Sequence, residues 1–335
     1  MNLDFYLEIL SIESTSGSER KLAEFLAERL KTERNETELM EVGDGTLNLL
    51  VTWGKPRVLF CTHLDTVPPY IAPSVHDADA EDREFRGRGT CDAKGQLFAM
   101  WSACEELERR GESGFGLLLL AGEETGSFGA KAFRNTDKGA EYVIVGEPTD
   151  NCMVSASKGT KSFLVTLKGV PFHSGYPENG KSAVESFVDF VEDLRNTSFP
   201  KDDLLGQTTW NIGKLVSDNP QNILSPELSF RLYFRTTFSS DEFVKALIPS
   251  LASKYEGMEY VAFGGDTPMR YTTFEGFPTK TVAFGSDAPQ LWNCEKKILC
   301  GAGSILVAHR PDEHILLSEL ETACGNYVRM FELIK

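Results

Sequence analysis

The chain has 335 residues, more than one ordinary hydrophobic core accommodates, which predicts two domains. Its 41% hydrophobic and 25% charged residues are typical of a soluble globular protein. The 34 Lys and Arg residues against 50 Asp and Glu residues give a net charge of −16, which disfavours nucleic acid as a partner, and no basic run favours a membrane surface.

The N-terminal segment and the cysteines indicate a compartment. The N-terminal segment carries early acidic residues and no signal region, and no stretch approaches the roughly 18 apolar residues that a membrane span needs. The seven cysteines are dispersed and contain no Cys-x-x-Cys pair. We therefore expect a cytoplasmic protein with reduced thiols, without a disulfide framework or a thiolate zinc site.

The chain begins with a helix signal, followed by two apolar runs. Ser16-Gly17-Ser18-Glu19 fits a capping box, and the apolar residues from Leu22 to Leu30 follow helical spacing behind it. The runs 47–52 and 58–61 are predicted as neighbouring strands, because each is short, apolar and bounded by polar or turn residues. Residues 70–90 are polar and are predicted as a loop.

Acidic or histidine residues follow three predicted buried strands. The run 58–61 is followed by His63 and Asp65, the run 115–121 by Glu123 and Glu124, and the run 142–146 by Glu147. In open α/β sheets, sites form outside the carboxyl ends of the strands, so we expect these side chains to lie together. A solvated loop position is the alternative for any one of these acids taken singly.

The His63-Leu64-Asp65 pattern indicates a metal ligand with a carboxylate neighbour. Residues i and i+2 of an extended chain point the same way, and a carboxylate commonly orients a metal-binding histidine. A polar loop that happens to contain histidine is the alternative. Histidines and carboxylates without cysteine suit Zn²⁺, and two divalent ions would offset the charge of several gathered acids.

The texture of the sequence changes after about residue 158. Six segments, predicted in the order strand, helix, strand, strand, helix, strand, indicate a ferredoxin-like βαββαβ module at 158–265. The α/β pattern then resumes. We predict an α/β catalytic domain with a mixed sheet, formed by 1–157 and 266–335, into which this module is inserted.

The motifs resemble those of the co-catalytic zinc amidohydrolases, which include acetylornithine deacetylase, succinyl-diaminopimelate desuccinylase and glutamate-releasing carboxypeptidase. The matching pieces span nearly the whole chain in the family's order. They are His63-Leu64-Asp65-Thr66-Val67, Gly87-Arg88-Gly89-Thr90-Cys91-Asp92-Ala93-Lys94-Gly95, Gly122-Glu123-Glu124-Thr125-Gly126, Gly146-Glu147-Pro148-Thr149, Lys158-Gly159, Phe172-His173-Ser174-Gly175, Asn222, Arg235 and Ala308-His309-Arg310-Pro311-Asp312-Glu313.

The resemblance implies a role for each residue of the site. The terminal ligands of two Zn²⁺ ions, for which Co²⁺ or Mn²⁺ could substitute, would be His63, Glu124, Glu147 and His309, with Asp92 as the bridge. Asp65 would orient His63, and Glu123 would be the general base, because a carboxylate beside a metal-activated water can pass its proton to the leaving nitrogen. The family also has a cis peptide after the bridging aspartate, which predicts a cis Asp92-Ala93 bond.

Four further residues are predicted to act on the substrate. In the family, the equivalent of His173 stabilises the oxyanion from the partner subunit, and the inserted module acts as a lid and forms a homodimer. Asn222 and Arg235 would hold the substrate carboxylate or the oxyanion, and Gly303 would line the substrate site. A surface histidine and a surface ion pair are the alternatives for His173 and Arg235.

The segment Ala308-His309-Arg310-Pro311-Asp312-Glu313 is most similar to acetylornithine deacetylases, and it selects His309 over His314 as the ligand. The resemblance therefore implies deacetylation of N-acetylornithine in arginine biosynthesis. The alternatives are an N-acetylcitrulline, N-acetyl-lysine or N-succinyl-amino-acid deacylase, a dipeptidase, or a catalytically silent metal-binding dimer. A serine or cysteine hydrolase is disfavoured, because the chain contains no Gly-x-Ser-x-Gly motif.

Overall fold

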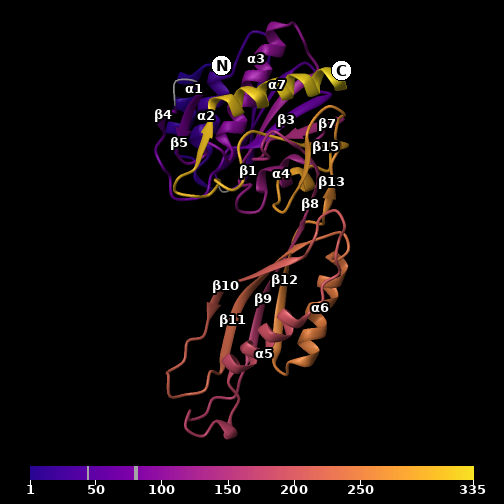
Figure 1. Cartoon of the computed structure of the whole chain (residues 1–335). Coiled ribbons are helices and arrows are strands. Elements are labelled where there is room, and N and C mark those ends of the chain that lie inside the picture. Colours follow the sequence, from indigo (N-terminus) through magenta and orange to yellow (C-terminus); the bar gives the residue numbers. More distant parts are fainter. Residues whose placement is uncertain (44, 79–81) are drawn as a thin grey trace. The chain divides into compact units, whose positions relative to one another are not determined.

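The computed structural model describes residues 1–43, 45–78 and 82–335. These residues form two compact units. Unit 1 comprises Met1–Ser155, Tyr271–Lys280 and Ser286–Lys335, and unit 2 comprises Ala156–Arg270 and Thr281–Gly285. Most of unit 2 is thus a single insertion into the sequence of unit 1, which contains both chain termini (Figure 1). The assignment of 1–157 and 266–335 to a catalytic domain, and of 158–265 to a lid, stays a prediction.

A six-stranded mixed sheet forms the centre of unit 1 (Figure 1). Its order is β1 (Glu36–Gly43), β2 (Thr46–Trp53), β6 (Phe115–Leu120), β3 (Val58–His63), β7 (Tyr142–Val145) and β15 (Lys296–Leu299). The last four strands run parallel to one another, whereas β2 is antiparallel to both β1 and β6. Every residue of β3 and β6 is buried, as expected for strands covered on both faces.

The prediction that the runs 47–52 and 58–61 are neighbouring strands was wrong, because β6 lies between β2 and β3. Gly116 of β6 explains how three strands fit so closely there. A Cβ at this position would lie 2.9 Å from the carbonyl oxygen of Val51 on one side and 3.0 Å from the side chain of Leu59 on the other. The hydrophobic pattern predicts both strands but carries no information on which third strand pairs between them.

Helices pack against this sheet and against each other. Those of unit 1 are α1 (Leu3–Ser11), α2 (Arg20–Arg29), α3 (Lys94–Arg109), α4 (Phe128–Phe133), the 3₁₀ turn η2 (Ala288–Gln290) and α7 (Leu317–Ile334). Helices α3 and α7 contact each other and both contact β3, while α2 and α4 contact β1 and β2 (Figure 1). Buried aromatic side chains join these layers: the rings of Tyr6 on α1 and Phe98 on α3 stack with centroids 4.6 Å apart.

Two further sheets have three strands each. One contains β16 (His314–Leu316), β5 (Asp82–Arg86) and β4 (Ser74–Ala78), and the other contains β13 (Met269–Arg270), β8 (Met153–Ser157) and β14 (Thr279–Val282). The prediction of a loop over 70–90 was therefore wrong for β4 and β5, and its residues 79–81 lie outside the described residues. These two strands are polar and short, with Phe85 the buried residue of β5, so they lack the apolar run that predicts a strand.

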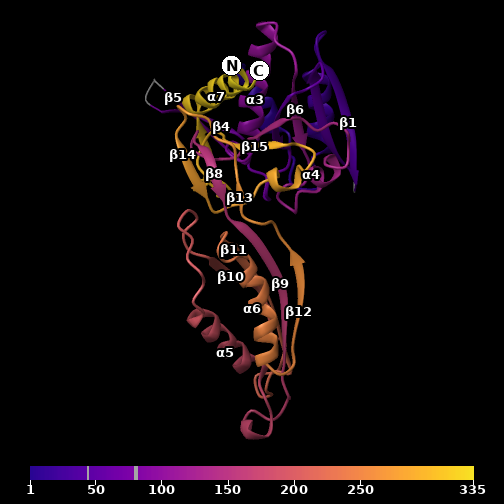
Figure 2. The same cartoon turned by 90° about the vertical axis from the view of Figure 1, so that its right-hand side faces the viewer.

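Unit 2 is a four-stranded antiparallel sheet with two helices on one side (Figure 2). Its elements are β9 (Gly159–Lys168), the 3₁₀ turn η1 (Pro177–Asn179), α5 (Ala183–Asn196), β10 (Thr209–Val216), β11 (Glu227–Thr236), α6 (Asp241–Lys254) and β12 (Met258–Gly264). The strand order β10-β11-β9-β12 confirms the predicted ferredoxin-like fold. Alternate residues of β11, namely Leu228, Phe230, Leu232 and Phe234, are buried in a core shared with α5 and α6.

All seven cysteines are free thiols, and burial raises the pKa of most of them, including Cys61 and Cys104. No helix among residues 1–43, 45–78 and 82–335 has the length and apolar content to cross a membrane.

Candidate metal centre

Parallel strands bring acidic and histidine residues to one edge of the central sheet. Cys61 of β3 lies opposite Val145 of β7, so His63 and Glu147 stand level with each other two residues further on. His63 lies opposite Leu120, the last residue of β6, and the turn that carries Glu123 and Glu124 follows at once. This edge is the carboxyl end of all three strands, where sites of α/β sheets form.

His63 is buried, and each of its ring nitrogens faces an oxygen. Its Nδ1 lies 2.9 Å from the backbone carbonyl oxygen of Asp65, and its Nε2 lies 3.0 Å from Oδ1 of Asp92. Burial alone would lower the pKa of this imidazole, but the hydrogen bonds to Asp65 and Asp92 outweigh it and raise the pKa well above its usual value. The contact at Nδ1 fixes the ring, so Nε2 is the nitrogen that faces the site.

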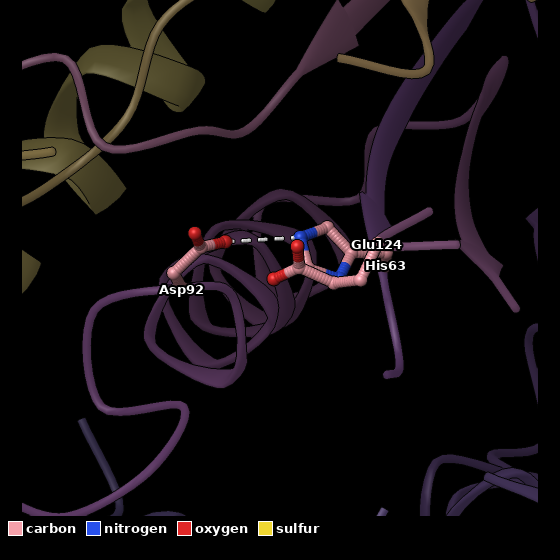
Figure 3. A group of neighbouring side chains, drawn as sticks. All are labelled: His63, Asp92 and Glu124. Atoms are coloured by element: carbon pink, nitrogen blue, oxygen red, sulfur yellow. Dashed lines mark hydrogen bonds and ion pairs between the residues drawn. The ribbon is translucent and has the colours of Figure 1, made fainter. Parts of the chain in front are cut away.

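Asp92, Glu124 and His309 complete the group. Asp92 lies in the turn between β5 and α3, and its Oδ2 is 3.2 Å from Nε2 of His309, which in turn is 2.8 Å from Oε1 of Glu124. The potential ligand atoms of His63, Asp92 and Glu124 all lie within 4.8 Å of one another, and the three side chains converge (Figure 3). The Asp92-Ala93 peptide is cis, as the resemblance predicts.

The electrostatics of this group reflect buried acids beside two histidines. Burial acts to raise the pKa of Asp92, but hydrogen bonds from His309 and His63 outweigh it and hold that pKa well below its usual value. Hydrogen bonds to Asp92 and Glu124 raise the pKa of His309 to about 10. The shifts of both groups have one cause, the attraction between the acids and the two imidazole rings.

Glu123 and Glu147 also feel the charges of His63 and Asp92, but among the described residues neither glutamate has a hydrogen bond to a histidine. Burial is the largest cause that raises the pKa of both carboxyl groups well above its usual range; His63 opposes the shift, and the charge of Asp92 adds to it. A carboxyl whose pKa is raised binds a proton more readily than an ordinary carboxyl, which is a property that a general base requires.

Asp65 holds the turn that carries the two glutamates. Its Oδ1 accepts the backbone N–H of Glu123 at 3.0 Å, its Oδ2 accepts the backbone N–H of Glu124 at 3.1 Å, and Oδ2 also accepts the hydroxyl of Ser16 at 2.8 Å. Burial opposes ionisation of Asp65, but these donors and the nearby His63 outweigh it and lower its pKa. Asp65 therefore fixes the turn of Glu123 and Glu124 next to His63.

Glu19 also holds the turn that carries Glu123 and Glu124, and the sequence did not predict this contact. The capping box predicted at 16–19 was wrong: Glu19 is the residue that precedes α2, and its side chain makes no capping hydrogen bond. Its Oε1 instead accepts the backbone N–H of Gly122 at 3.2 Å. Its side chain is fully buried, and that burial raises its pKa. A glutamate after a serine can either cap a helix or accept a hydrogen bond from a distant backbone amide, so only the fold shows which of the two it does.

Asp287 is a second residue that sequence reasoning missed. It is 1% exposed, it immediately precedes η2, and its charge helps to raise the pKa of both Glu123 and Glu147. The sequence predicts only a short helix near this position. A Ser-Asp pair before a turn is the one signal there, and it is too common to indicate a site.

Three residues predicted to act on the substrate belong to unit 2. His173 and Asn222 lie on adjacent backbone segments: Ser174 N–H donates to the carbonyl oxygen of Asn222 at 2.9 Å, and His173 forms a bridge with Ile223. The backbone N–H of Gly175 donates to His173 Nδ1 at 3.0 Å, so the neutral ring carries its proton on Nε2 and can donate it outward. Arg235 lies at the far end of β11, opposite Thr160.

Gly303 and the remaining histidines differ in where they lie. Gly303 is buried in a turn with a φ of +69°, and a Cβ there would lie 2.6 Å from Sγ of Cys91, so the segment before Asp92 requires glycine at this position. His314 pairs with Arg86 between β16 and β5, and its Nδ1 faces the carbonyl oxygen of Asp312. His76 faces the hydroxyl of Ser74 on β4. Of the late histidines, His309 is the one placed with the acids.

The donor set fits a divalent cation. It consists of imidazole nitrogens and carboxylate oxygens, which Zn²⁺ and its neighbours accept, and several of the acids are buried. Buried carboxylates held this close repel one another unless protons or cations offset their charge.

Comparison with known proteins identifies the family of this chain. Residues 59–333 match peptidase family M20/M25/M40. A probable carboxypeptidase of Aspergillus clavatus is 30% identical over 364 residues, which cover 98% of this chain and 88% of that protein.

Two solved structures share the fold. A tripeptidase from Staphylococcus aureus has a TM-score of 0.84 and 18% identity, covering 99% of this chain and 97% of the other. An M20 family metallo-carboxypeptidase from Sulfolobus solfataricus has a TM-score of 0.78 and 17% identity, covering 99% and 98%. This chain therefore belongs to peptidase family M20/M25/M40 and is a hydrolytic enzyme.

Proposed function

We propose that this chain hydrolyses, with a bound metal, the amide bond of a small peptide-like substrate that ends in a free carboxylate. The observation that carries the proposal is the convergence of His63, Asp92 and Glu124, with Glu123 next in sequence to one of them. The 30% identical relative named a probable carboxypeptidase supports a carboxypeptidase or dipeptidase reaction. An N-acyl amino acid, such as N-acetylornithine, presents the same amide and carboxylate and is the narrower alternative.

The proposed metal ligands are His63, Asp92, Glu124, Glu147 and His309. Asp92 presents one carboxylate oxygen to each histidine, at 3.0 and 3.2 Å, which suits a residue shared between two ions. Zinc is the ion that the donor set favours, with Co²⁺ or Mn²⁺ as substitutes. When bound, the metal would lower the pKa of water and polarise the substrate carbonyl.

Glu123 is the proposed general base. Its neighbour Glu124 faces His309, whereas Glu123 is half-buried and lies in the electrostatic field of His63 and Asp287. Asp65 fixes the backbone of both residues, so the two carboxylates keep different directions. Glu123 would take a proton from water and deliver it to the leaving nitrogen, which needs a carboxyl whose pKa lies above the usual range.

His173 and Arg235 are the proposed substrate contacts from unit 2, with His173 as the oxyanion donor. They stand at opposite ends of the same sheet: His173 follows the Lys168 end of β9, and Arg235 pairs with Thr160 at the other end. The eight steps from Glu227 to Arg235 span about 26 Å along β11. One copy of unit 2 cannot bring both side chains to one small substrate, so we propose that His173 and Asn222 act from a partner chain in a homodimer.

The experiment that tests the function is a panel of substrates with zinc added. It would contain Gly-X and X-Gly dipeptides, tripeptides, N-acetyl-, N-succinyl- and benzyloxycarbonyl-amino acids, N-acetylornithine and N-acetylcitrulline, each assayed for amine release with and without chelator. We expect chelator-sensitive release from substrates with a free carboxylate and none from their amides. Equal hydrolysis of the amides would contradict the role of Arg235, and activity that survives chelation would contradict the metal.

The same substrate panel also tests two alternative functions. Release of ornithine from N-acetylornithine alone would assign a step of arginine biosynthesis and support the predicted cytoplasmic location. Bound metal with no release from any substrate would support a catalytically silent metal-binding dimer. Glu123 argues against the silent alternative, because a protein that only binds metal has no use for a carboxyl with a raised pKa outside the proposed ligand group.

A further inference from the structure

A buried ion pair lies behind the metal-ligand group. Nη1 of Arg88 and Oε2 of Glu313 are 2.6 Å apart, and the two side chains are 2% and 0% exposed. The residues are 225 positions apart in the sequence, one in the turn after β5 and the other directly before β16. A pair this deeply buried loses the hydration of both charges, so its other hydrogen-bonding groups must also be satisfied.

Glu313 satisfies its second oxygen with three backbone donors. Its Oε1 accepts the N–H groups of Gly89 at 2.9 Å, Cys91 at 3.1 Å and Asp92 at 3.1 Å. The backbone N–H of Gly87 also donates to the carbonyl oxygen of Glu313, at 3.0 Å. The turn that carries Asp92 is therefore wrapped around one carboxylate, which fixes the backbone from which Asp92 projects.

Arg88 extends the same contact to two other segments of the site. Its Nη1 donates to the carbonyl oxygen of Arg310 at 3.2 Å, and its Nη2 lies 3.5 Å from the carbonyl oxygen of His309. Its Nε donates to the carbonyl oxygen of Pro69 at 3.3 Å, in the segment that follows Asp65. The planar guanidinium carries five N–H donors in a fixed fork on three nitrogens, whereas an ammonium group has three donors on a single nitrogen.

His309 is the ligand that most needs this support. Its backbone φ is +65°, in the left-handed region that a residue with a Cβ adopts rarely, and its side chain is 48% exposed. It lies in the long connection between β15 and β16, outside any helix or strand. The contacts of Arg88 with the carbonyl groups of His309 and Arg310 tie this connection to the turn of Asp92.

We infer that Arg88 and Glu313 are the positioning residues that assemble the metal centre, because they join the segments carrying Asp65, Asp92 and His309. Neither residue is a ligand or touches the substrate. The inference rests on the proposed function, since it assigns the pair the task of setting the distance between Asp92 and His309 at which a cation binds. Its consequence is measurable as metal affinity, separately from the stability of the fold.

The test measures zinc affinity by competition with a chromophoric chelator, together with the melting temperature of the metal-free protein. Arg88→Met and Glu313→Gln are expected to bind zinc about 10- to 100-fold more weakly than the wild type, as do other variants of residues that orient ligands. Arg88→Lys keeps the charge and is expected to fall between these variants and the wild type. The matched control is Lys161→Met, which breaks another buried ion pair, Lys161–Asp241 at 2.7 Å in unit 2.

The outcomes separate the two claims. Weakened zinc binding in the Arg88 and Glu313 variants, with unchanged binding in Lys161→Met, supports the inference. Lower melting temperatures with wild-type zinc affinity in the Arg88 and Glu313 variants would show that the pair only stabilises the fold, which overturns the inference and leaves the proposed function intact. A wild-type protein that binds no zinc, Co²⁺ or Mn²⁺ would overturn both. If Arg88→Met does not fold, Arg88→Lys provides the same comparison.

Discussion

The carboxylate of Glu19 accepts a hydrogen bond from the backbone N–H of Gly122, a residue 103 positions later in the chain. Asp65 accepts the next two backbone N–H groups, those of Glu123 and Glu124. Three successive amides of the proposed catalytic turn thus donate to two buried carboxylates from the first part of the chain. The turn is therefore held by two residues that lie outside the proposed ligand set.

Removing the Glu19 side chain should therefore affect the turn. Glu19→Ala leaves the amide of Gly122 unsatisfied and is expected to lower the free energy of unfolding by about 1–3 kcal/mol. We also expect a lower kcat with little change in KM, whereas Glu19→Gln keeps an acceptor oxygen and should retain most of both. Urea unfolding and steady-state kinetics measure these effects. Glu24→Ala, at an exposed position of α2, is the control and should change stability by less than about 1 kcal/mol.

Glu123→Gln should separate catalysis from metal binding. The amide cannot accept and deliver a proton, so kcat is expected to fall about 10²- to 10⁴-fold while zinc content and melting temperature stay near the wild-type values. Metal analysis of the purified protein and turnover on the best substrate of the panel check this. Glu124→Gln is the contrasting variant, since it faces His309 and should lose zinc. Wild-type turnover in Glu123→Gln would show that the proposed mechanism is wrong.

Zinc binding should release protons and should tighten as the pH rises. Without metal, hydrogen bonds to Asp92 and Glu124 raise the pKa of His309 to about 10, and the pKa of His63 is also well above its usual value. His309 is therefore protonated at pH 7, and a ring nitrogen that carries a proton must lose it before it can bind zinc. Each proton released makes the affinity rise about tenfold per pH unit below the pKa. Calorimetry in two buffers with different ionisation enthalpies gives the number of protons, and an unchanged affinity from pH 6 to 8 would contradict the role of the histidines.

The metal-free protein should show the opposite pH dependence in its stability. The folded pKa of His309, about 10, exceeds its ordinary value of 6.5, so protonation of His309 stabilises the fold. That contribution is complete below about pH 6.5 and is lost as the pH rises through about 10. We expect the melting temperature of the chelator-treated wild type to fall over this range more than that of His309→Gln. Saturation with zinc should remove the difference at high pH.

Mixing of variants tests whether His173 acts from a partner chain. His173→Ala removes an oxyanion donor and should lower kcat about 10²-fold or more. If the histidine acts across a dimer, inactive His173→Ala and inactive Glu123→Gln chains should form mixed dimers that contain one complete site. Random exchange of equal amounts of subunits in a symmetric dimer would restore about a quarter of the wild-type activity. No recovery after verified exchange would place His173 and Glu123 in the same chain.

The order of elements in unit 2 could be read from the sequence, whereas the pairing in unit 1 could not. The alternation of β11 and the helical spacing of α5 and α6 specify a ferredoxin-like order, because local periodicity determines which face is buried. The insertion of β6 between β2 and β3 is a long-range pairing, close at Gly116, and no local pattern reports it. The polar strands β4 and β5 likewise pair with each other and with the distant β16, which no apolar run predicts.

The sequence by itself determined the types of residue at the metal centre. Buried strands that end in histidine and acids predict a nitrogen and oxygen site at one sheet edge, since strand ends of a parallel sheet meet there. Only the tertiary structure decided what supports that site. Glu19, Arg88 and Glu313 act through long-range contacts between segments up to 225 residues apart, and Asp287 acts through its charge; such interactions leave no periodicity or spacing in the sequence. A ligand set can be recognised from local motifs, but its geometry depends on how the chain folds back on itself.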